Sequence, residues 1–127
     1  MSSSDANRRI LLIDDEPDLC RIVKVTLERL KGWEILTADS IQAGLTQAEG
    51  KQPDVILLDL TLDGNGLTLL QTLKNNLATQ AIPVILFTAT NPSEDSLDFN
   101  PADIAGIILK PFSVLLLADQ IIEQLGW

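Results

Sequence analysis

Five short apolar runs recur along the chain, and enough residues for one helix separate each run from the next. Four of the five runs are continuously apolar, as expected of parallel strands that are covered on both faces. The run that begins at Glu34 is more mixed and is typical of an edge strand. The five runs are Ile10 to Ile13, Glu34 to Thr37, Val55 to Leu58, Val84 to Phe87 and Ile107 to Leu109.

The segments between the runs carry helical signals. Pro17 suits the first position of a helix that Gly32 ends. Ser40 can cap a second helix that ends at Gly50, and Ser113 can cap the last one. Strand and helix alternate, which predicts a parallel α/β sheet with right-handed crossovers. The apolar positions at helical spacing are Leu19, Ile22, Val23, Leu27 and Leu30, then Ile41, Leu45 and Ala48, then Leu69, Leu70, Leu73 and Leu77, and finally Leu117, Ile121 and Leu125.

One segment between two predicted strands departs from this pattern. From Asn91 to Ala105 the chain has few apolar residues, and prolines stand at positions 92 and 101. Proline restricts the residue before it and interrupts helical hydrogen bonding, so at most a short helix fits between the two. We therefore expect a fourth helix that is short, irregular or mobile.

Length and composition limit the class of protein. A chain of 127 residues with 46% hydrophobic residues fits one compact domain, which we expect to span residues 9–127 after a flexible segment 1–8. A single cysteine, Cys20, excludes an intrachain disulfide and a thiolate metal cluster. The chain shows neither a secretory signal nor the roughly 20 apolar residues of a membrane span. We expect a cytoplasmic protein that does not bind membranes.

Charge and the absence of histidine exclude further classes. The net charge is −9, and the nine basic residues form no cluster, so a nucleic-acid backbone would be repelled. The chain contains no histidine, which removes the commonest general base and an imidazole metal ligand. Any metal site must therefore use oxygen ligands.

Polar residues stand where four of the predicted strands end. The first run is followed by Asp14-Asp15-Glu16, the third by Asp59, the fourth by Thr88 and the fifth by Lys110. Ligands of open parallel α/β sheets bind beyond the carboxyl ends of the strands, so we expect these side chains to converge. Clustered carboxylates repel one another unless a proton or a cation joins them, and hard oxygen ligands favour Mg²⁺, with Mn²⁺ also possible.

Each of these residues also has an ordinary structural interpretation. Asp14-Asp15-Glu16 before a proline could cap a helix, and Asp59 could be a turn residue. Thr88 could be an ordinary residue at a strand end, and Lys110 could lie in a solvated loop. Their joint occurrence at four strand ends, in this order, favours a site for a phosphoryl group that moves onto a carboxylate.

The motifs resemble those of the response-regulator receiver family, which includes the bacterial chemotaxis response regulator. IDDEP, VILLDL, ILFTAT and ILKPF each follow the corresponding strand, and the resemblance extends from about Arg9 to Leu125. It implies a doubly wound, flavodoxin-like receiver fold with five parallel strands in the order 2-1-3-4-5. It also implies a phosphorylation switch rather than a conventional enzyme, although such a domain assists its own phosphorylation and dephosphorylation.

The resemblance assigns a role to each matching position. Asp59 is the expected phosphoacceptor, Asp15 a direct Mg²⁺ ligand, and Asp14 a ligand that acts mainly through a coordinated water. The remaining assignments are the backbone carbonyl of Thr61 as a metal ligand, Thr88 as the switch hydroxyl, Ala89 as a small residue whose backbone contacts the phosphoryl group, and Lys110 as a contact to a phosphoryl oxygen, preceding a cis bond to Pro111.

Three features depart from the family pattern. Ile107 occupies a position that is usually aromatic, three residues before the lysine. The loop after Asp59 lacks a proline and reaches Gly66 after seven positions instead of eight, so it is one residue shorter. The weak fourth helix is the third departure.

Two functional hypotheses follow. In the first, a histidine kinase or phosphotransfer protein phosphorylates Asp59 of a stand-alone domain, which then signals through contacts with an unknown downstream protein. In the second, the domain is a phosphorylation-independent interaction module, which the three departures favour. An aspartyl phosphatase would need an acid where Thr61 stands, and a flavin site would need a phosphate loop where Asp14-Asp15-Glu16 would repel the phosphate.

The last predicted helix has apolar residues off its main stripe. Leu115 and Leu116 either belong to a broad buried face or form an apolar docking patch for a partner or a second copy in a homodimer.

Overall fold

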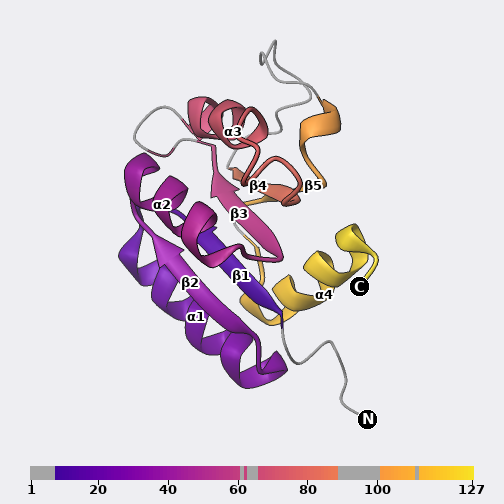
Figure 1. Cartoon of the computed structure of the whole chain (residues 1–127). Coiled ribbons are helices and arrows are strands. Elements are labelled where there is room, and N and C mark those ends of the chain that lie inside the picture. Colours follow the sequence, from indigo (N-terminus) through magenta and orange to yellow (C-terminus); the bar gives the residue numbers. More distant parts are fainter. Residues whose placement is uncertain (1–7, 61, 63–65, 89–100, 111) are drawn as a thin grey trace.

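The computed structural model describes residues 8–60, 62, 66–88, 101–110 and 112–127. Within them, five parallel strands form one sheet in the order β2-β1-β3-β4-β5 (Figure 1). The predicted parallel sheet, its strand order and the edge position of the second strand are confirmed. The strands are β1 (Arg9–Ile13), β2 (Glu34–Ala38), β3 (Val55–Asp59), β4 (Val84–Thr88) and β5 (Gly106–Leu109).

Helices cover both faces of the sheet (Figure 1). One core lies under α1 and α4 and contains Ile10 and Leu12, and the other lies under α2 and α3 and contains Leu11 and Ile13. Alternate residues of β1 thus point to opposite cores, and all four are fully buried. No helix of the described residues is long and apolar enough to cross a membrane. The helices are α1 (Pro17–Lys31), α2 (Ile41–Lys51), α3 (Gly66–Lys74) and α4 (Val114–Leu125).

Strand register brings the polar residues of the sheet to a common edge. In the ladder between β1 and β3, Ile13 pairs with Leu58, which places the next residues, Asp14 and Asp59, side by side. In the ladder between β4 and β5, Thr88 pairs with the last residue of β5. The carboxyl edge of the sheet therefore carries the polar strand-end residues that were predicted to converge there.

Three predicted helix boundaries are confirmed, namely both ends of α1 and the start of α2. Pro17 is the first residue of α1, where its missing N–H is not needed by the helix. Gly32 follows α1 with φ of 69°, a left-handed conformation that glycine adopts without strain. Ser40 caps α2, because its hydroxyl accepts a hydrogen bond of 3.1 Å from the backbone N–H of Ala43.

The predicted end of α2 at Gly50 is wrong by one residue. The helix continues to Lys51, and Gln52 takes the left-handed conformation with φ of 50°. Gln52 stabilises this end because its side-chain amide donates to the carbonyl oxygens of Ala48, Glu49 and Ala78. A long-range contact therefore decides where the helix ends.

The predicted third helix is correct up to Lys74, but Leu77 does not belong to its buried face. Leu77 follows the helix and is 87% exposed. The chain turns at Asn76, whose side-chain oxygen accepts a hydrogen bond from the N–H of Ala78. Thr79 then enters the core and its hydroxyl donates 2.7 Å to the carbonyl of Leu73.

Several apolar positions on α1 and α4 are exposed rather than buried. Ile22 and Leu30 of α1 are each about half exposed, although both were expected on its apolar stripe. Leu115 and Leu116 of α4 are 70% and 56% exposed, so the broad-buried-face interpretation is wrong for them. A docking role for this pair stays a prediction.

The segment between β4 and β5 falls mostly outside the described residues. The stretch between the two prolines, where a short fourth helix was expected, lies outside the described residues, and a single 3-10 turn, Pro101–Asp103, stands just before β5. The predicted segment 1–8 is described only at Arg8. Its guanidinium lies 4.1 Å from the ring centroid of Trp127, which packs edge-on against Trp33.

The turn after α3 provides a stability test. Thr79→Val keeps the buried side chain's shape but leaves the Leu73 carbonyl without its hydroxyl donor, so we expect a loss of about 1 kcal/mol in unfolding free energy. The matched control is Thr72→Val, because Thr72 is exposed and its change is expected to stay within about 0.5 kcal/mol. Urea unfolding followed by circular dichroism measures both, and equal losses in the two variants would contradict this account of the turn.

Candidate functional site

Three aspartates meet at the carboxyl edge of the sheet. Asp14 follows β1, Asp15 is the next residue in the turn, and Asp59 is the last residue of β3. One carboxylate oxygen from each lies within 4.8 Å of the others. Asp14 and Asp59 are buried and Asp15 is exposed. We call these three residues the acidic cluster, and their predicted convergence is confirmed.

Lys110 follows β5, an edge strand, and its side chain extends to the acidic cluster. Its ammonium nitrogen lies 2.8 Å from Asp14 Oδ2, 3.0 Å from Glu16 Oε1 and 3.8 Å from Asp59 Oδ2. The backbone N–H of Lys110 donates 2.7 Å to the carbonyl of Thr88, which extends the pairing of β5 with β4 by one residue. The sheet thus aims the lysine across the carboxylates, as the sequence predicted.

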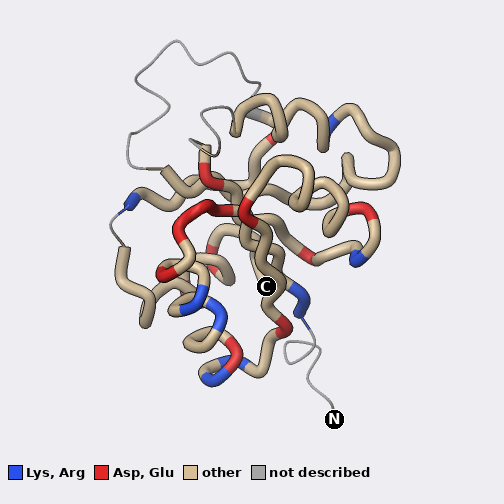
Figure 2. The backbone as a smooth tube through the Cα atoms, turned by 90° about the vertical axis from the view of Figure 1, so that its left-hand side faces the viewer, with Lys and Arg blue, Asp and Glu red and all other residues tan. Residues whose placement is uncertain are grey.

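The contact between Lys110 and Glu16 was not predicted. The sequence offers Glu16 as a helix cap or as one acid of the turn after β1, and its partner depends on how that turn is folded. Asp14 Oδ1 accepts a hydrogen bond of 2.9 Å from the Glu16 N–H, which fixes the turn. This turn is the longest continuous acidic stretch of the described chain (Figure 2).

The side chains of Asp14 and Glu16 do not cap α1. Glu16 is the residue before α1, yet its side chain makes no capping hydrogen bond. Asp14 uses one oxygen for the Glu16 N–H and the other for Lys110, while its backbone carbonyl accepts from the Cys20 thiol at 3.3 Å. The simple capping interpretation is therefore wrong for Asp14 and Glu16.

Burial and charge shift the pKa of both Asp14 and Lys110. Burial is the largest influence on Asp14 and raises the pKa of its carboxyl, against the lowering effects of Lys110 and the Glu16 N–H. Burial is the largest single influence on the Lys110 ammonium and would lower its pKa. Its hydrogen bonds to Asp14 and Glu16 and the charges of Asp14 and Asp59 together outweigh burial and raise that pKa. Lys110 therefore keeps its charge, whereas Asp14 ionises less readily than an ordinary aspartate.

The acidic cluster suits a small divalent cation. Its side-chain ligands are all carboxylate oxygens, which Mg²⁺ and Mn²⁺ prefer over softer donors. Asp15 is exposed, so ligands from outside the protein could approach the same cation. The residues present fit the cation that the sequence predicted.

Gly66 closes the loop after Asp59. Its N–H donates 3.0 Å to the carbonyl of Leu60. A Cβ atom at this position would clash with the backbone oxygen of Asp59, so only glycine lets α3 begin so close to the acceptor. The sequence showed the unusual spacing of Gly66 but not this steric reason.

Of the remaining predicted site residues, some lie within the described part of the structure and others lie outside it. Thr88 is buried at the end of β4, at the edge that carries the acidic cluster. Ile107, in place of the family's aromatic residue, is partly buried and packs against the core under α2 and α3. The predicted backbone contacts of Thr61 and Ala89, and the cis bond to Pro111, lie outside the described residues.

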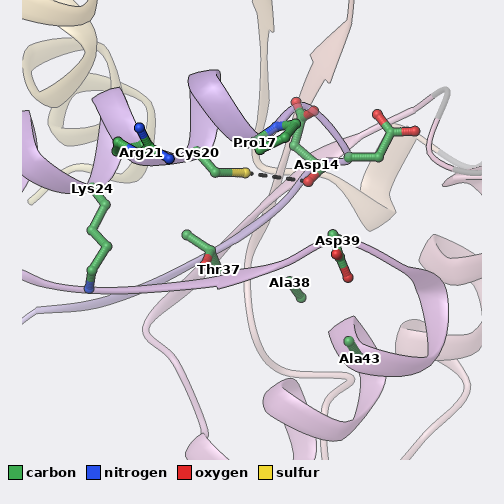
Figure 3. Close-up of a pocket in the computed structure, with 10 residues that line it drawn as sticks. Asp14, Pro17, Cys20, Arg21, Lys24, Thr37, Ala38, Asp39 and Ala43 are labelled. Atoms are coloured by element: carbon green, nitrogen blue, oxygen red, sulfur yellow. Dashed lines mark hydrogen bonds between the residues drawn. The ribbon is translucent and has the colours of Figure 1, made fainter.

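A pocket of about 480 Å³ opens beside the acidic cluster. It lies between α1, the end of β2 and the start of α2, and Cys20 and Thr37 line it from opposite elements (Figure 3). Burial and the charge of Asp14 raise the pKa of the Cys20 thiol to about 11, so this thiol is not a nucleophile at neutral pH.

The fold and the arrangement of the site agree with a family comparison. A family model described as the response regulator receiver domain matches residues 10–122. The chain belongs to the response regulator receiver domain family. This receiver domain matches a CheY-like receiver domain protein from Methanospirillum hungatei with a TM-score of 0.81 and 28% identity over 94% of each chain. It matches a two-component response regulator from Clostridium difficile with a TM-score of 0.80 and 27% identity, over 94% of this chain and 96% of that one.

Curated relatives of the receiver domain are named as transcriptional regulatory proteins. TcrX of Mycobacterium tuberculosis, named a probable one, is 36% identical over 106 residues, which cover 83% of this chain and 44% of that protein. KdpE of Escherichia coli is 31% identical over 106 residues, covering 83% and 45%. PhoB of Pseudomonas aeruginosa is 34% identical over 107 residues, covering 84% and 46%. The chain spans less than half the length of these relatives.

The close approach of Gly66 to Asp59 gives a direct test of the site's backbone. Gly66→Ala forces a methyl group against the Asp59 carbonyl, and we expect it to lower the unfolding free energy by about 1–3 kcal/mol. The matched control is Gly50→Ala, because a Cβ there meets nothing within 4 Å and alanine favours the helix by up to about 1 kcal/mol. Thermal unfolding of both variants checks this, and a Gly66→Ala protein as stable as the wild type would contradict the packing described.

Proposed function

We propose that this receiver domain accepts a phosphoryl group on Asp59 in a Mg²⁺-dependent reaction, within a two-component signalling system in the cytoplasm. The donor would be a histidine kinase or a phosphotransfer protein. The observation that carries the proposal is the buried Asp59 carboxylate, with two further aspartates within 4.8 Å and the Lys110 ammonium 3.8 Å away. Family membership supports it, because receiver domains are phosphoacceptors.

The chemistry is the transfer of one phosphoryl group from a phosphorylated donor to the Asp59 carboxylate. An Asp59 carboxylate oxygen forms a bond to phosphorus while the bond from phosphorus to the donor nitrogen or oxygen breaks and its electron pair leaves with the donor. A Mg²⁺ ion held by Asp14, Asp15 and Asp59 would neutralise the phosphoryl oxygens. Lys110 adds a second positive charge beside Asp59, and its raised pKa keeps it charged. No side chain is needed as a general base, since the attacking carboxylate carries no proton.

The other assigned roles belong to the same proposal. The Thr88 hydroxyl would act as the switch that contacts the new phosphoryl group from the end of β4. The backbone of Ala89 would contact the same group, and the carbonyl of Thr61 would complete the metal ligands. Output would then pass through contacts with an unidentified downstream protein. The net charge of −9 argues against direct nucleic-acid binding by this domain.

The phosphorylation-independent module remains the second candidate. Ile107 favours it, because an aliphatic residue replaces the ring that ordinarily accompanies the switch threonine in this family. Gly66, on the other hand, lets the shortened loop pack closely on the Asp59 backbone. An interaction module would need neither Lys110 nor the three acids, so their presence together counts against it.

Labelling with a small phosphodonor separates the two candidates. We expect acetyl phosphate with Mg²⁺ to add one phosphoryl group to the wild type, seen by intact-mass spectrometry. Asp59→Asn should abolish the addition because the amide is not a carboxylate nucleophile.

Asp54→Asn is the matched control. Asp54 lies just before the same strand, at its opposite end, and its carboxylate accepts a hydrogen bond from the Arg9 N–H. This variant should be labelled as the wild type is. Unlabelled wild type that is folded and has Mg²⁺ present would favour the phosphorylation-independent module, and labelled Asp59→Asn would move the acceptor elsewhere.

A further inference from the structure

The Lys110 ammonium is closer to the turn after β1 than to Asp59. Its distances to Asp14 and Glu16 are 2.8 and 3.0 Å, within hydrogen-bond range, whereas Asp59 is 3.8 Å away. The lysine side chain is only 17% exposed, so it has little water to replace a lost partner. Moving this ammonium toward a group on Asp59 means weakening its bonds to the turn.

A bound cation would affect the attraction of Asp14 and of Glu16 for Lys110 differently. Asp14 belongs to the acidic cluster, so a cation there would neutralise much of its attraction for Lys110. Glu16 is not a member of that cluster, and its side chain is 60% exposed at the edge of the site. Its attraction for Lys110 therefore persists after the cation has bound.

The position of Glu16 is fixed by the backbone on both sides. Its N–H donates to Asp14 Oδ1, and the next residue, Pro17, begins α1. The side chain consequently leaves the turn at a defined place, 3.0 Å from the ammonium. The backbone thus starts the Glu16 side chain within reach of Lys110, where the two side chains form an ion pair.

We propose that Glu16 is a positioning residue that competes with a phosphoryl group for the Lys110 ammonium. The inference rests on the proposed function of Asp59. Glu16 holds the lysine beside the turn when Asp59 is unmodified, and it opposes the shift of the lysine toward a phosphoryl group. Its carboxylate thereby sets how strongly the site binds that group, without touching the cation.

The phosphoryl mimic fluoroberyllate, titrated with Mg²⁺ into the full chain in a calorimeter, measures this competition. Glu16→Gln removes the charge and should tighten fluoroberyllate binding by about threefold, the strength expected of an ion pair whose carboxylate is largely exposed. Glu16→Asp keeps the charge but is shorter by one methylene, so it holds Lys110 less well and should also tighten binding, by a smaller factor. The matched control is Glu28→Gln, which removes the same charge from an ion pair with Lys24 on α1 and should bind as the wild type does.

A second measurement separates positioning from a structural role. Urea unfolding in the presence of a chelator should show Glu16→Gln with a slightly lower midpoint than the wild type, because the ion pair with Lys110 is lost. Binding and stability then change in opposite directions. A residue that only supported the fold would weaken both.

Each outcome bears on the proposal. Weaker binding by Glu16→Gln, or binding equal to that of the wild type, overturns the competition. Tighter binding by Glu16→Gln with unchanged Glu16→Asp shows that the charge repels the anion directly and does not act through Lys110, which also overturns it. A folded wild type that binds Mg²⁺ but no fluoroberyllate would remove the phosphoryl site itself, and this inference with it.

Discussion

The hydrogen-bonded ion pair between Lys110 and Asp14 connects the last strand of the sheet to the first and makes the buried acids tolerable. Two unit charges about 4 Å apart repel by roughly 4 kcal/mol at an effective dielectric of ~20, and desolvation adds to this for groups as buried as Asp14 and Asp59. One ammonium cannot neutralise three carboxylates and Glu16. The remaining negative charge is what makes the acidic cluster suitable for a divalent cation and then for a phosphoryl group.

Strand pairing in the sheet determines which charged side chains lie together at the site. Pairing of β1 with β3 places Asp14 beside Asp59, and pairing of β5 with β4 continues to the Lys110 N–H. The Gly66 contact lets α3 begin against the backbone of Asp59. A shift of one residue in any of these pairings would turn a charged side chain to the other face, so the buried cores on both sides of the sheet also fix the geometry of the site.

Much of the fold and the acidic cluster was predictable from sequence, for a simple physical reason. Strands buried on both faces must be continuously apolar, and the first polar residue after each strand necessarily lies at the carboxyl edge. What failed depended on particular side-chain hydrogen bonds, one between distant segments and two within the turn after α3. Gln52 ends α2 through a bond to Ala78, and Leu77 is outside α3 because Asn76 and Thr79 form a turn. Local propensity contains neither contact.

The role of Glu16 was missed for the same kind of reason. Its partner is 94 positions away along the chain, and an acid before a proline looks like a helix cap in the sequence alone. The strand-end pattern identified Lys110 as a cation near the site, but only the side-chain distances show that the ammonium is shared unequally among Asp14, Glu16 and Asp59.

Calorimetric titration with Mg²⁺ alone tests most directly whether the three aspartates share a cation. The account predicts saturable binding to the wild type that Asp15→Asn greatly weakens, while Asp18→Asn, which removes an exposed acid one helical position after Pro17, leaves it unchanged. A folded wild type that takes up no Mg²⁺, or equal binding by the Asp15→Asn variant and the wild type, would contradict it.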